Sequence, residues 1–255
     1  IDVSKICYLT YQSFPSEKAN TIQTISNLKY FVKNGYDVEL IFPLRETNSS
    51  DKIENLEKYY NFNEKIKING VKHNYPFGKV YFLEKLSFLI SHRLWSRNIV
   101  KKLLTSKYKA DVFFTRSEWI SYFLSKNNQS VIYECHQLSK LKRLLIPLIL
   151  KNKKSKIIFL NENLLTETKL KKNFYSQVTV IHNGVDHELF KETVTKNKNH
   201  IIFVGNLIRF NNNRNIDFLI NSFKDKRLSE NYKLKIIGGP EEELVRLNKI
   251  IRNNN

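Results

Sequence analysis

The sequence predicts an α/β protein made of two doubly wound units, the second of them incomplete. Short segments rich in Val, Ile, Phe and Tyr alternate with longer segments whose apolar residues recur at helical spacing, which is the pattern of a helix-covered parallel sheet. A polar, Lys- and Asn-rich stretch at 193–199 interrupts the pattern, which then restarts with two further strands. Two strand–helix units are too few to cover both faces of a sheet, so we expect the second unit to be cut short.

The chain opens with a βαβ unit. Residues 5–10 form the first predicted strand, and apolar residues at helical spacing follow over 22–32. Gly35 stands where a helix commonly ends in the left-handed conformation. Residues 38–42 form the second strand, which Pro43 is expected to close. A strand, a helix and a strand in this order predict parallel pairing.

The same alternation continues along the chain. Residues 47–79 are mostly polar and predict one helix with one or two short strands, and 81–104 predict a long amphipathic helix, either continuous or broken. Strands and helices are then expected in turn at 111–115, 118–124, 131–133, 138–150, 156–160, 162–173 and 178–181.

A turn formed by Asn183 and Gly184 marks the end of the first unit. We therefore expect two domains, 1–185 and 186–255. In the second, strands and helices are expected at 201–204, 215–223, 234–237 and from 241 onward.

Composition narrows the possible partners and compartment. The formal net charge of +19 predicts attraction to nucleic acid, acidic lipid or a phosphorylated ligand, or else a solvated basic surface. The two cysteines, Cys7 and Cys135, are far apart, which favours a reducing, cytoplasmic compartment. No apolar run approaches the ~20 residues of a membrane span. Because the chain contains no methionine, we expect a fragment or a trimmed chain.

Residues 131–138 (VIYECHQL) bring a carboxylate, a thiol and an imidazole to the end of a predicted strand. His136 is a capped or core histidine, a metal ligand together with Cys135, or part of a binding crevice. The metal site is the weakest of these, because adjacent strand residues point to opposite faces and no second Cys/His pair follows. The crevice agrees with the position of ligands in open α/β sheets, which is outside the carboxyl ends of the strands.

Six short segments occur in an order that is typical of a known family. The most specific is an Asn-Gly-Val-Asp turn at 183–186 followed by a Val-Gly-x-Leu segment at 204–207. The others are found at 14–23, 115–117, 133–136 and 236–240. With these segments the chain resembles the retaining glycosyltransferases of family 4, which have the GT-B fold.

The resemblance implies two Rossmann-like domains, with an acceptor site in 1–185 and a nucleotide-sugar site in 186–255. It implies transfer of a sugar from a nucleotide-sugar to a glycan or lipid-linked acceptor with retention, as in the synthesis of surface polysaccharides. It places His136 near the donor sugar, where the imidazole would hydrogen-bond the sugar or stabilise positive charge. The leaving phosphate would accept the acceptor's proton, so no carboxylate nucleophile is expected.

For the donor diphosphate the resemblance points to Gly205, Asn206, Arg209 and Arg214. Asn206 stands where the family usually has an arginine, and Arg214 replaces a lysine, with Asn215 in the place of a glycine. Arg209 is a candidate for the missing cation, and Gly205 would let the backbone approach phosphate closely. Solvated loop cations and a plain turn glycine are the competing interpretations. The family's paired glutamates, separated by seven residues, have no counterpart in this chain.

On the acceptor side, the resemblance points to the first strand–helix junction and to the segment after the strand at 111–115. The candidate residues are Ser16, Ala19, Asn20, Gln23, Arg116 and Glu118. A capped helix start is the competing interpretation of the junction.

No metal ion and no cofactor are expected, because the sequence has no Asp-x-Asp motif to hold a divalent ion. Cations and backbone amides would then stabilise the departing diphosphate. Basic stretches at 140–143 and 151–156, and an aromatic helix at 82–95 followed by basic residues at 97–102, suit docking on an anionic membrane. We therefore expect a cytoplasmic protein that is peripheral on the inner face of the membrane, with core faces and solvated rims as the alternative.

Two alternatives to a glycosyltransferase stay open. One is a non-catalytic basic module that binds nucleic acid or membrane on a degenerate fold, and the other is a nucleotide-sugar epimerase of the same fold. We expect no nucleic-acid partner, because the basic residues are not concentrated on one recognition helix and no aromatic stacking motif occurs.

Overall fold

The computed structural model describes residues 4–75, 83–185, 195–209 and 212–252. The chain divides into two compact units, Ile1–Asp186 and His187–Asn255. Each unit has a parallel sheet and a hydrophobic core of its own.

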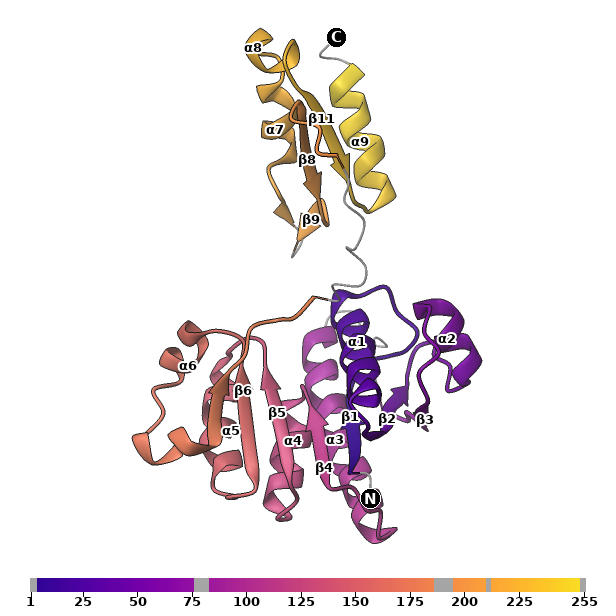
Figure 1. Cartoon of the computed structure of the whole chain (residues 1–255), viewed down its shortest axis with the longest axis vertical. Helices are drawn as coiled ribbons and strands as arrows, with labels where there is room; N and C mark the ends of the chain where they lie inside the picture. The colour runs from indigo at the N-terminus through magenta and orange to yellow at the C-terminus, as the bar shows by residue number, and fades with distance from the viewer. Residues whose placement is uncertain (1–3, 76–82, 186–194, 210–211, 253–255) are drawn as a thin grey trace. The chain divides into compact units, whose positions relative to one another are not determined.

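In the described residues the first unit is built on a seven-stranded parallel sheet of order β3-β2-β1-β4-β5-β6-β7 (Figure 1). Because β1 lies between β2 and β4, the chain adds strands first on one side of β1 and later on the other. This reversal makes a switch point between β1 and β4, the place where open α/β sheets bind ligands. The strands are β1 Lys5–Leu9, β2 Asp37–Leu44, β3 Ile66–Lys72, β4 Val112–Thr115, β5 Val131–Cys135, β6 Ser155–Phe159 and β7 Val178–Val180.

Helices cover both faces of this sheet (Figure 1). Helices α1, Ala19–Lys33, and α2, Ile53–Tyr60, pack on one face. Helices α3, Glu84–Thr105, α4, Glu118–Lys126, and α5, Lys140–Leu150, pack on the other.

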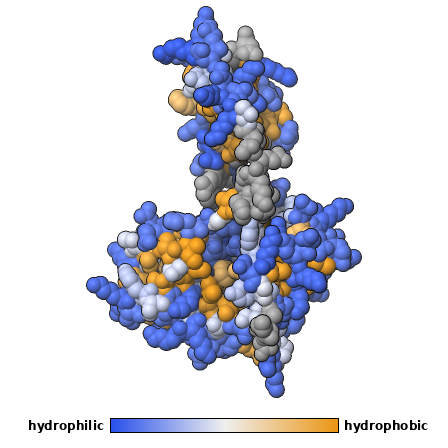
Figure 2. All heavy atoms as spheres, in the orientation of Figure 1, coloured by the Kyte–Doolittle hydropathy of each residue, from blue (hydrophilic) through white to orange (hydrophobic). Residues whose placement is uncertain are grey.

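The period-2 alternation of strand side chains explains this layering. In β1, Tyr8 joins the core with α1, whereas Cys7 and Leu9 join the core with α3 and α4. All three are fully buried, as expected for a strand covered on both faces. In Figure 2, apolar residues are exposed over β5 and β6, and Ile132 and Ile158 of these strands are only partly buried.

The predicted strands and helices of the first unit are largely confirmed. The polar region 47–79 contains α2 and β3, and the long helix α3 is continuous, although its expected start at 81 lies outside the described residues. Gly35 follows α1 with φ +86°, as predicted.

Three boundaries differ from the prediction. Pro43 does not close its strand but lies inside β2, where pairing with β1 has already ended at Ile41, so an N–H is less needed. Strand β5 continues to Cys135, because Glu134 and Cys135 pair with β6. The helix expected over 162–173 stops earlier: α6 is Glu162–Thr168, Lys169 is left-handed, and a 3₁₀ turn follows at Lys172–Gln177.

The second unit pairs β8, His200–Val204, with β11, Lys233–Ile237, in parallel. Helices α7, Ile216–Ser222, and α9, Glu241–Arg252, close its small core. The predicted elements are confirmed. The sequence reasoning missed the short hairpin of β9 and β10 and the helix α8, which are Ile208–Arg209, Asn212–Asn213 and Lys226–Ser229.

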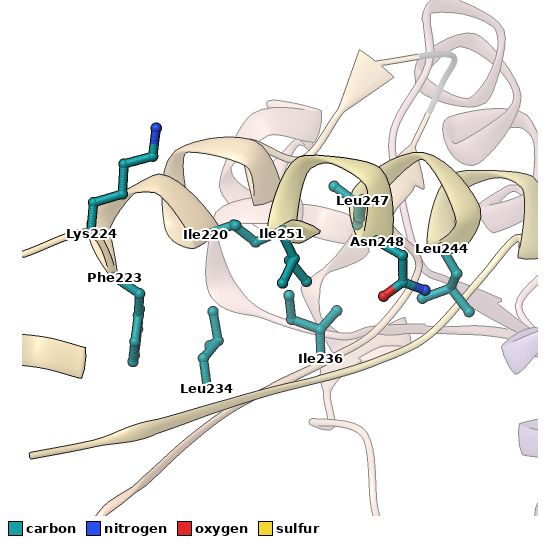
Figure 3. A pocket seen from close by; sticks show the side chains of 9 residues that line it. All are labelled: Ile220, Phe223, Lys224, Leu234, Ile236, Leu244, Leu247, Asn248 and Ile251. Carbon is teal, nitrogen blue, oxygen red and sulfur yellow. The ribbon is translucent and has the colours of Figure 1, made fainter. Parts of the chain in front are cut away.

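One face of the β8–β11 sheet packs on the helices through Phe203, Leu234 and Ile236. On the alternate positions, Val204 and Ile237 are 70% and 56% exposed. A groove of about 330 Å³ runs between α7, β11 and α9; its lining is mainly apolar, and the side chain of Lys224 points away from it (Figure 3). None of the residues predicted to bind the donor lines this groove.

Among the described helices, none has the length and apolarity needed to cross a membrane.

Candidate functional site

Polar residues follow the carboxyl ends of four neighbouring strands in the first unit. Thr10 follows β1, Arg45 follows β2, Arg116 follows β4 and His136 follows β5. Since all the strands are parallel, these residues meet at one edge of the sheet, around the switch point. They line a cavity of about 550 Å³ whose other lining residues are Tyr11, Gln12, Asn20, Phe88, Leu89, His92, Ser117, Glu118, Gln137, Ser139 and Lys142.

Arg116 is the centre of a hydrogen-bond network in this cavity. Its Nη1 donates to the backbone oxygen of Asn20, at 3.2 Å, and to Oε1 of Gln23, at 3.3 Å. Its Nη2 donates to Nδ1 of His136, at 2.6 Å. One planar guanidinium thus joins the start of α1 to the end of β5, and this arrangement fixes the position of the imidazole.

The contacts of His136 determine its tautomer. An arginine can only donate, so the bond from Arg116 requires a lone pair on Nδ1 and leaves the proton of the neutral ring on Nε2. Nε2 lies 3.2 Å from Oε2 of Glu134, and Arg116 Nε lies 3.8 Å from the same oxygen. Neither Nε2 nor Oε2 has a well-directed hydrogen bond. Glu134 therefore acts as a buried carboxylate beside both the imidazole and the guanidinium.

Gln23 extends the network to the segment after β7. Its Oε1 accepts from Arg116, and its Nε2 donates to Oδ1 of Asn183, at 2.7 Å. Asn183 is thus tied to the first helix, although the turn predicted at 183–184 is not found in the structure.

The structure brings Asn20, Gln23, Arg116 and His136 together, and Glu118 lines the same cavity. The assignment of these residues to an acceptor or to a donor remains a prediction.

Ser16 and Ala19, which were predicted on the acceptor side, are not among the residues that line the cavity. The backbone of Ser16 binds the Tyr60 hydroxyl through both its N–H and its carbonyl, at 2.7 and 2.9 Å. Thr21 Oγ1 donates to the same carbonyl, at 2.8 Å. Ser16 therefore fixes the loop before α1, while Ala19 is an exposed first residue of that helix.

A second group of cavity residues was not predicted. The rings of Tyr11 and His92 are stacked, with centroids 4.5 Å apart and an interplanar angle of 19°. The guanidinium of Arg45 lies 4.6 Å from the centre of the Tyr11 ring. Tyr11 and Arg45 could have been predicted from their positions after strands, but His92 lies within a long amphipathic helix, where its sequence position gives no indication of a site.

His92 is a buried imidazole that shares a hydrogen bond with Ser117. Its Nε2 lies 2.6 Å from Oγ of Ser117, which in turn accepts from the backbone N–H of Ile120 and caps α4. Burial and the nearby charges of Arg45 and Lys142 lower the pKa of His92 to about 3.

The pKa values of Tyr11 and of the neighbouring His73 are also shifted. Burial, together with the charge of Arg45, lowers the pKa of His73 to about 4, and burial raises that of Tyr11 to about 12. His73 Nε2 and the Tyr11 hydroxyl lie 2.8 Å apart. At neutral pH both histidines are therefore uncharged and the tyrosine is protonated.

In the second unit, two glycine segments pack together at the carboxyl ends of β8 and β11. Gly205 has φ +151°, and Leu207 N–H donates to the carbonyl of Gly239, at 2.9 Å. A Cβ on Gly238 would lie 1.9 Å from the carbonyl oxygen of Gly205. Only glycine allows this close approach.

Arg214 lies beside this pair of glycines, as its predicted role requires. Its Nη1 would be 3.3 Å from a Cβ on Gly205, and its guanidinium lies 5.4 Å from the centre of the Phe203 ring. Asn215 is left-handed, with φ 59°, in the place predicted for a glycine. Asn206 is exposed in the turn after β8, and Arg209 belongs to the hairpin strand β9. Binding of a donor by these residues remains a prediction.

The metal alternative for His136 finds no support in the geometry. The Cys135 side chain is buried in the core under α5, and its Sγ donates to the carbonyl of Gln137, at 3.5 Å. Among the described residues, no three His, Cys, Asp or Glu side chains are grouped so that they could hold a metal ion.

Solved structures match the fold at low sequence identity. A glycosyltransferase from Rickettsia africae has 16% identity and a TM-score of 0.63, over 100% of this chain and 66% of that one. The lipopolysaccharide outer core galactosyltransferase WaaB has 14% identity and a TM-score of 0.58, over 98% of this chain and 65% of that one. A UDP-GlcNAc 2-epimerase from Methanocaldococcus jannaschii has 14% identity and a TM-score of 0.56, over 98% and 69%.

The chain has a GT-B-like fold. It spans about two thirds of the length of the solved structures that it matches. Neither a protein-family model nor a curated protein matches its sequence. The similarity to these solved structures is therefore one of fold.

Proposed function

We propose that this protein is a glycosyltransferase that moves a sugar from a nucleotide-sugar donor to a glycan or lipid-linked acceptor. The observation that carries the proposal is the Arg116–His136–Glu134 network at the switch point of a GT-B-like fold. Glycosyl transfer develops positive charge on the sugar and negative charge on the leaving phosphate. A site for this reaction needs polar groups that are held in place before the substrate binds, and the network provides them.

His136 is the proposed catalytic residue. Arg116 and Glu134 flank the ring at Nδ1 and near Nε2, so its plane is set by the protein. We propose that the imidazole hydrogen-bonds the donor sugar or stabilises the positive charge of the transition state. Retention, with the leaving phosphate as the base for the acceptor's hydroxyl, would then need no carboxylate nucleophile.

The second unit is the proposed donor-binding domain. The glycines at the ends of β8 and β11 let two backbone segments approach each other closely, and Arg214 lies next to Gly205. Phosphate groups bind well where backbone amides and an arginine lie together. Asn206 and Arg209 are the remaining candidates for contacts with the diphosphate.

Isothermal titration of the protein with a panel of nucleotide-sugars tests the proposal. We expect one nucleotide-sugar to bind, and Arg214→Gln to weaken its binding about tenfold, the loss of a charge-assisted contact. His136→Ala should leave nucleotide affinity nearly intact. A panel without any binding would exclude the proposed function.

A synthetic role in surface polysaccharide assembly is supported by the match to a lipopolysaccharide galactosyltransferase. The basic, partly apolar outer faces of α3 and α5 support docking on an anionic membrane at its cytoplasmic side. In these helices Ile90 and Leu144 are 46% and 71% exposed. They lie beside basic residues such as Arg93 and Arg143. Co-sedimentation with anionic and neutral vesicles would test this part of the proposal.

A nucleotide-sugar epimerase is the second candidate, because an epimerase shares the fold. The two functions differ in their need for an acceptor. Conversion of the sugar in the absence of any acceptor would indicate the epimerase, and product that forms only with an acceptor would indicate the transferase.

A further inference from the structure

Two cations from distant parts of the sequence line the cavity beside the stacked rings of Tyr11 and His92. Arg45 follows β2, and Lys142 lies in the first turn of α5. Neither was predicted as a site residue, and the Arg116–His136 network does not use them. The cavity therefore has a second cationic region in addition to the network.

Arg45 is held rigidly in this region. Its side chain is only 8% exposed, and its Nε donates to Oγ of Ser13, at 2.7 Å. The guanidinium lies 4.6 Å from the centre of the Tyr11 ring and 5.7 Å from that of Phe88. Glu46 Oε1 lies 3.7 Å from Nη2. A guanidinium fixed by two rings and a hydroxyl can bind an anion without losing much side-chain freedom.

Two cations act on the His92 ring. The charged groups that act on this ring are Arg45 and Lys142, and both lower its pKa. In the described part of the chain, no ion pair is found for Lys142, whereas Arg116 is already beside Glu134. Glu118 is the single acid among the residues that line the cavity. The described lining of the cavity thus has three cations, Arg45, Arg116 and Lys142, and one acid.

We propose that Arg45 and Lys142 form a subsite for a phosphate group on the acceptor. This inference rests on the proposed function and gives the acceptor's chemical class, a phosphorylated sugar. Tyr11 and His92 are only 6% and 7% exposed; their rings stack on each other, and Tyr11 packs against the guanidinium of Arg45 and helps to hold it in place. Arg116 and His136 line the same cavity, which at about 550 Å³ has the size of a small-molecule site.

The experiment is isothermal titration of the whole chain, without nucleotide-sugar, with glucose 6-phosphate and with glucose. We expect glucose 6-phosphate to bind at least about tenfold more tightly than glucose, since a charge-assisted contact contributes this much or more. Equal affinity for the two sugars would overturn the proposal.

Two matched variants test whether the phosphate binds at Lys142. Lys142→Gln should lower the affinity for glucose 6-phosphate about tenfold, because it removes the partly buried charge that lacks an acidic partner. Lys154→Gln, an exposed lysine before β6, should leave it unchanged. An unchanged affinity in Lys142→Gln would also overturn the proposal. This test does not depend on Arg45, whose burial makes its replacement a risk to folding.

Two further measurements are needed. One distinguishes a lipid-borne phosphate from a soluble one, and the other distinguishes failure of this inference from failure of the proposed function. Binding to phosphatidylcholine vesicles that contain phosphatidic acid, weakened by Lys142→Gln, would show a lipid-borne phosphate, and binding of glucose 6-phosphate alone a soluble one. Nucleotide-sugar binding without preference for the phosphorylated sugar would overturn this inference and leave the proposed function standing. Preference for the phosphorylated sugar without any binding of a nucleotide-sugar would leave the anion site standing but exclude its role as an acceptor site.

Discussion

Two histidines line one cavity, and their surroundings give them different properties. His136 follows a strand and is held between Arg116 and Glu134, so each of its nitrogens lies near a charged group. His92 comes from the middle of α3, stacks on Tyr11 and bonds to the hydroxyl of Ser117. The comparison shows that a polar network positions the first ring, while burial and neighbouring cations keep the second one neutral.

The largest expected effect is the loss of turnover in His136→Ala. We expect turnover to fall at least about tenfold, with nucleotide affinity nearly unchanged, because the substitution removes a group that acts on the reacting sugar. Steady-state kinetics and titration with the donor would measure the two quantities. His200→Ala, at the amino end of β8, is the matched control and should retain turnover. Normal turnover in His136→Ala would return this residue to a structural role.

Ser117→Ala should lower stability through both of the serine's bonds. The variant loses the cap of α4 and leaves His92 Nε2 without its partner, at a cost of about 2–3 kcal/mol. Ser139→Ala is the control, because Ser139 also caps a helix, through the N–H of Lys142, and in the described part of the chain no hydrogen bond joins it to a histidine. Its cost should be about 1 kcal/mol. Equal midpoints in urea denaturation of the two variants would show that the Ser117–His92 bond contributes nothing.

The neutral state of His92 predicts a pH dependence of stability. Its pKa falls from 6.5 in the unfolded chain to about 3 in the fold, so between these values the unfolded state binds the extra proton. Stability that is present above pH 6.5 is therefore lost as the pH falls, by at most about 1.4 kcal/mol per unit. In His92→Phe the number of protons taken up on unfolding between pH 6 and 5 should be lower by about one, so that stability falls less steeply with decreasing pH. Parallel curves for the two proteins would contradict the buried neutral assignment.

The smallest effect is expected for Gln23→Ala. This change removes one of the acceptors of Arg116 and the bond to Asn183, but the bonds to Asn20 and His136 remain. We expect a cost of about 0.5–1.5 kcal/mol in urea denaturation and a decrease in turnover that is smaller than for His136→Ala. An effect as large as that of His136→Ala would show that Gln23, and not the imidazole, is the central residue.

The strand ends explain how much of the site the sequence predicts. Arg116 and His136 directly follow apolar segments of strand type, so their place at the sheet edge is predictable. Arg45 was missed because Pro43 suggests an earlier end of β2, whereas the strand continues where its pairing with β1 has stopped. His92 was missed because α3 is a long amphipathic helix, in which burial of a polar residue depends on tertiary packing.

In the second unit, the sequence predicts the strands and main helices but not the hairpin of β9 and β10, whose strands have only two residues each. The proximity of Gly205 and Arg214 is predictable only from the resemblance, since eight residues of turn and hairpin separate them. Local sequence pattern thus defines the elements, and contacts between elements determine the site.

The most direct test of the central claim is proton NMR of the protein mixed with individual nucleotide-sugars, with and without a phosphorylated acceptor. We expect that one nucleotide-sugar is consumed only when the acceptor is present, that free nucleotide is released, and that the new glycosidic bond has the anomeric configuration of the donor. If no nucleotide-sugar perturbs the protein's spectrum or is consumed, the cavity at the switch point is not a glycosyltransferase site.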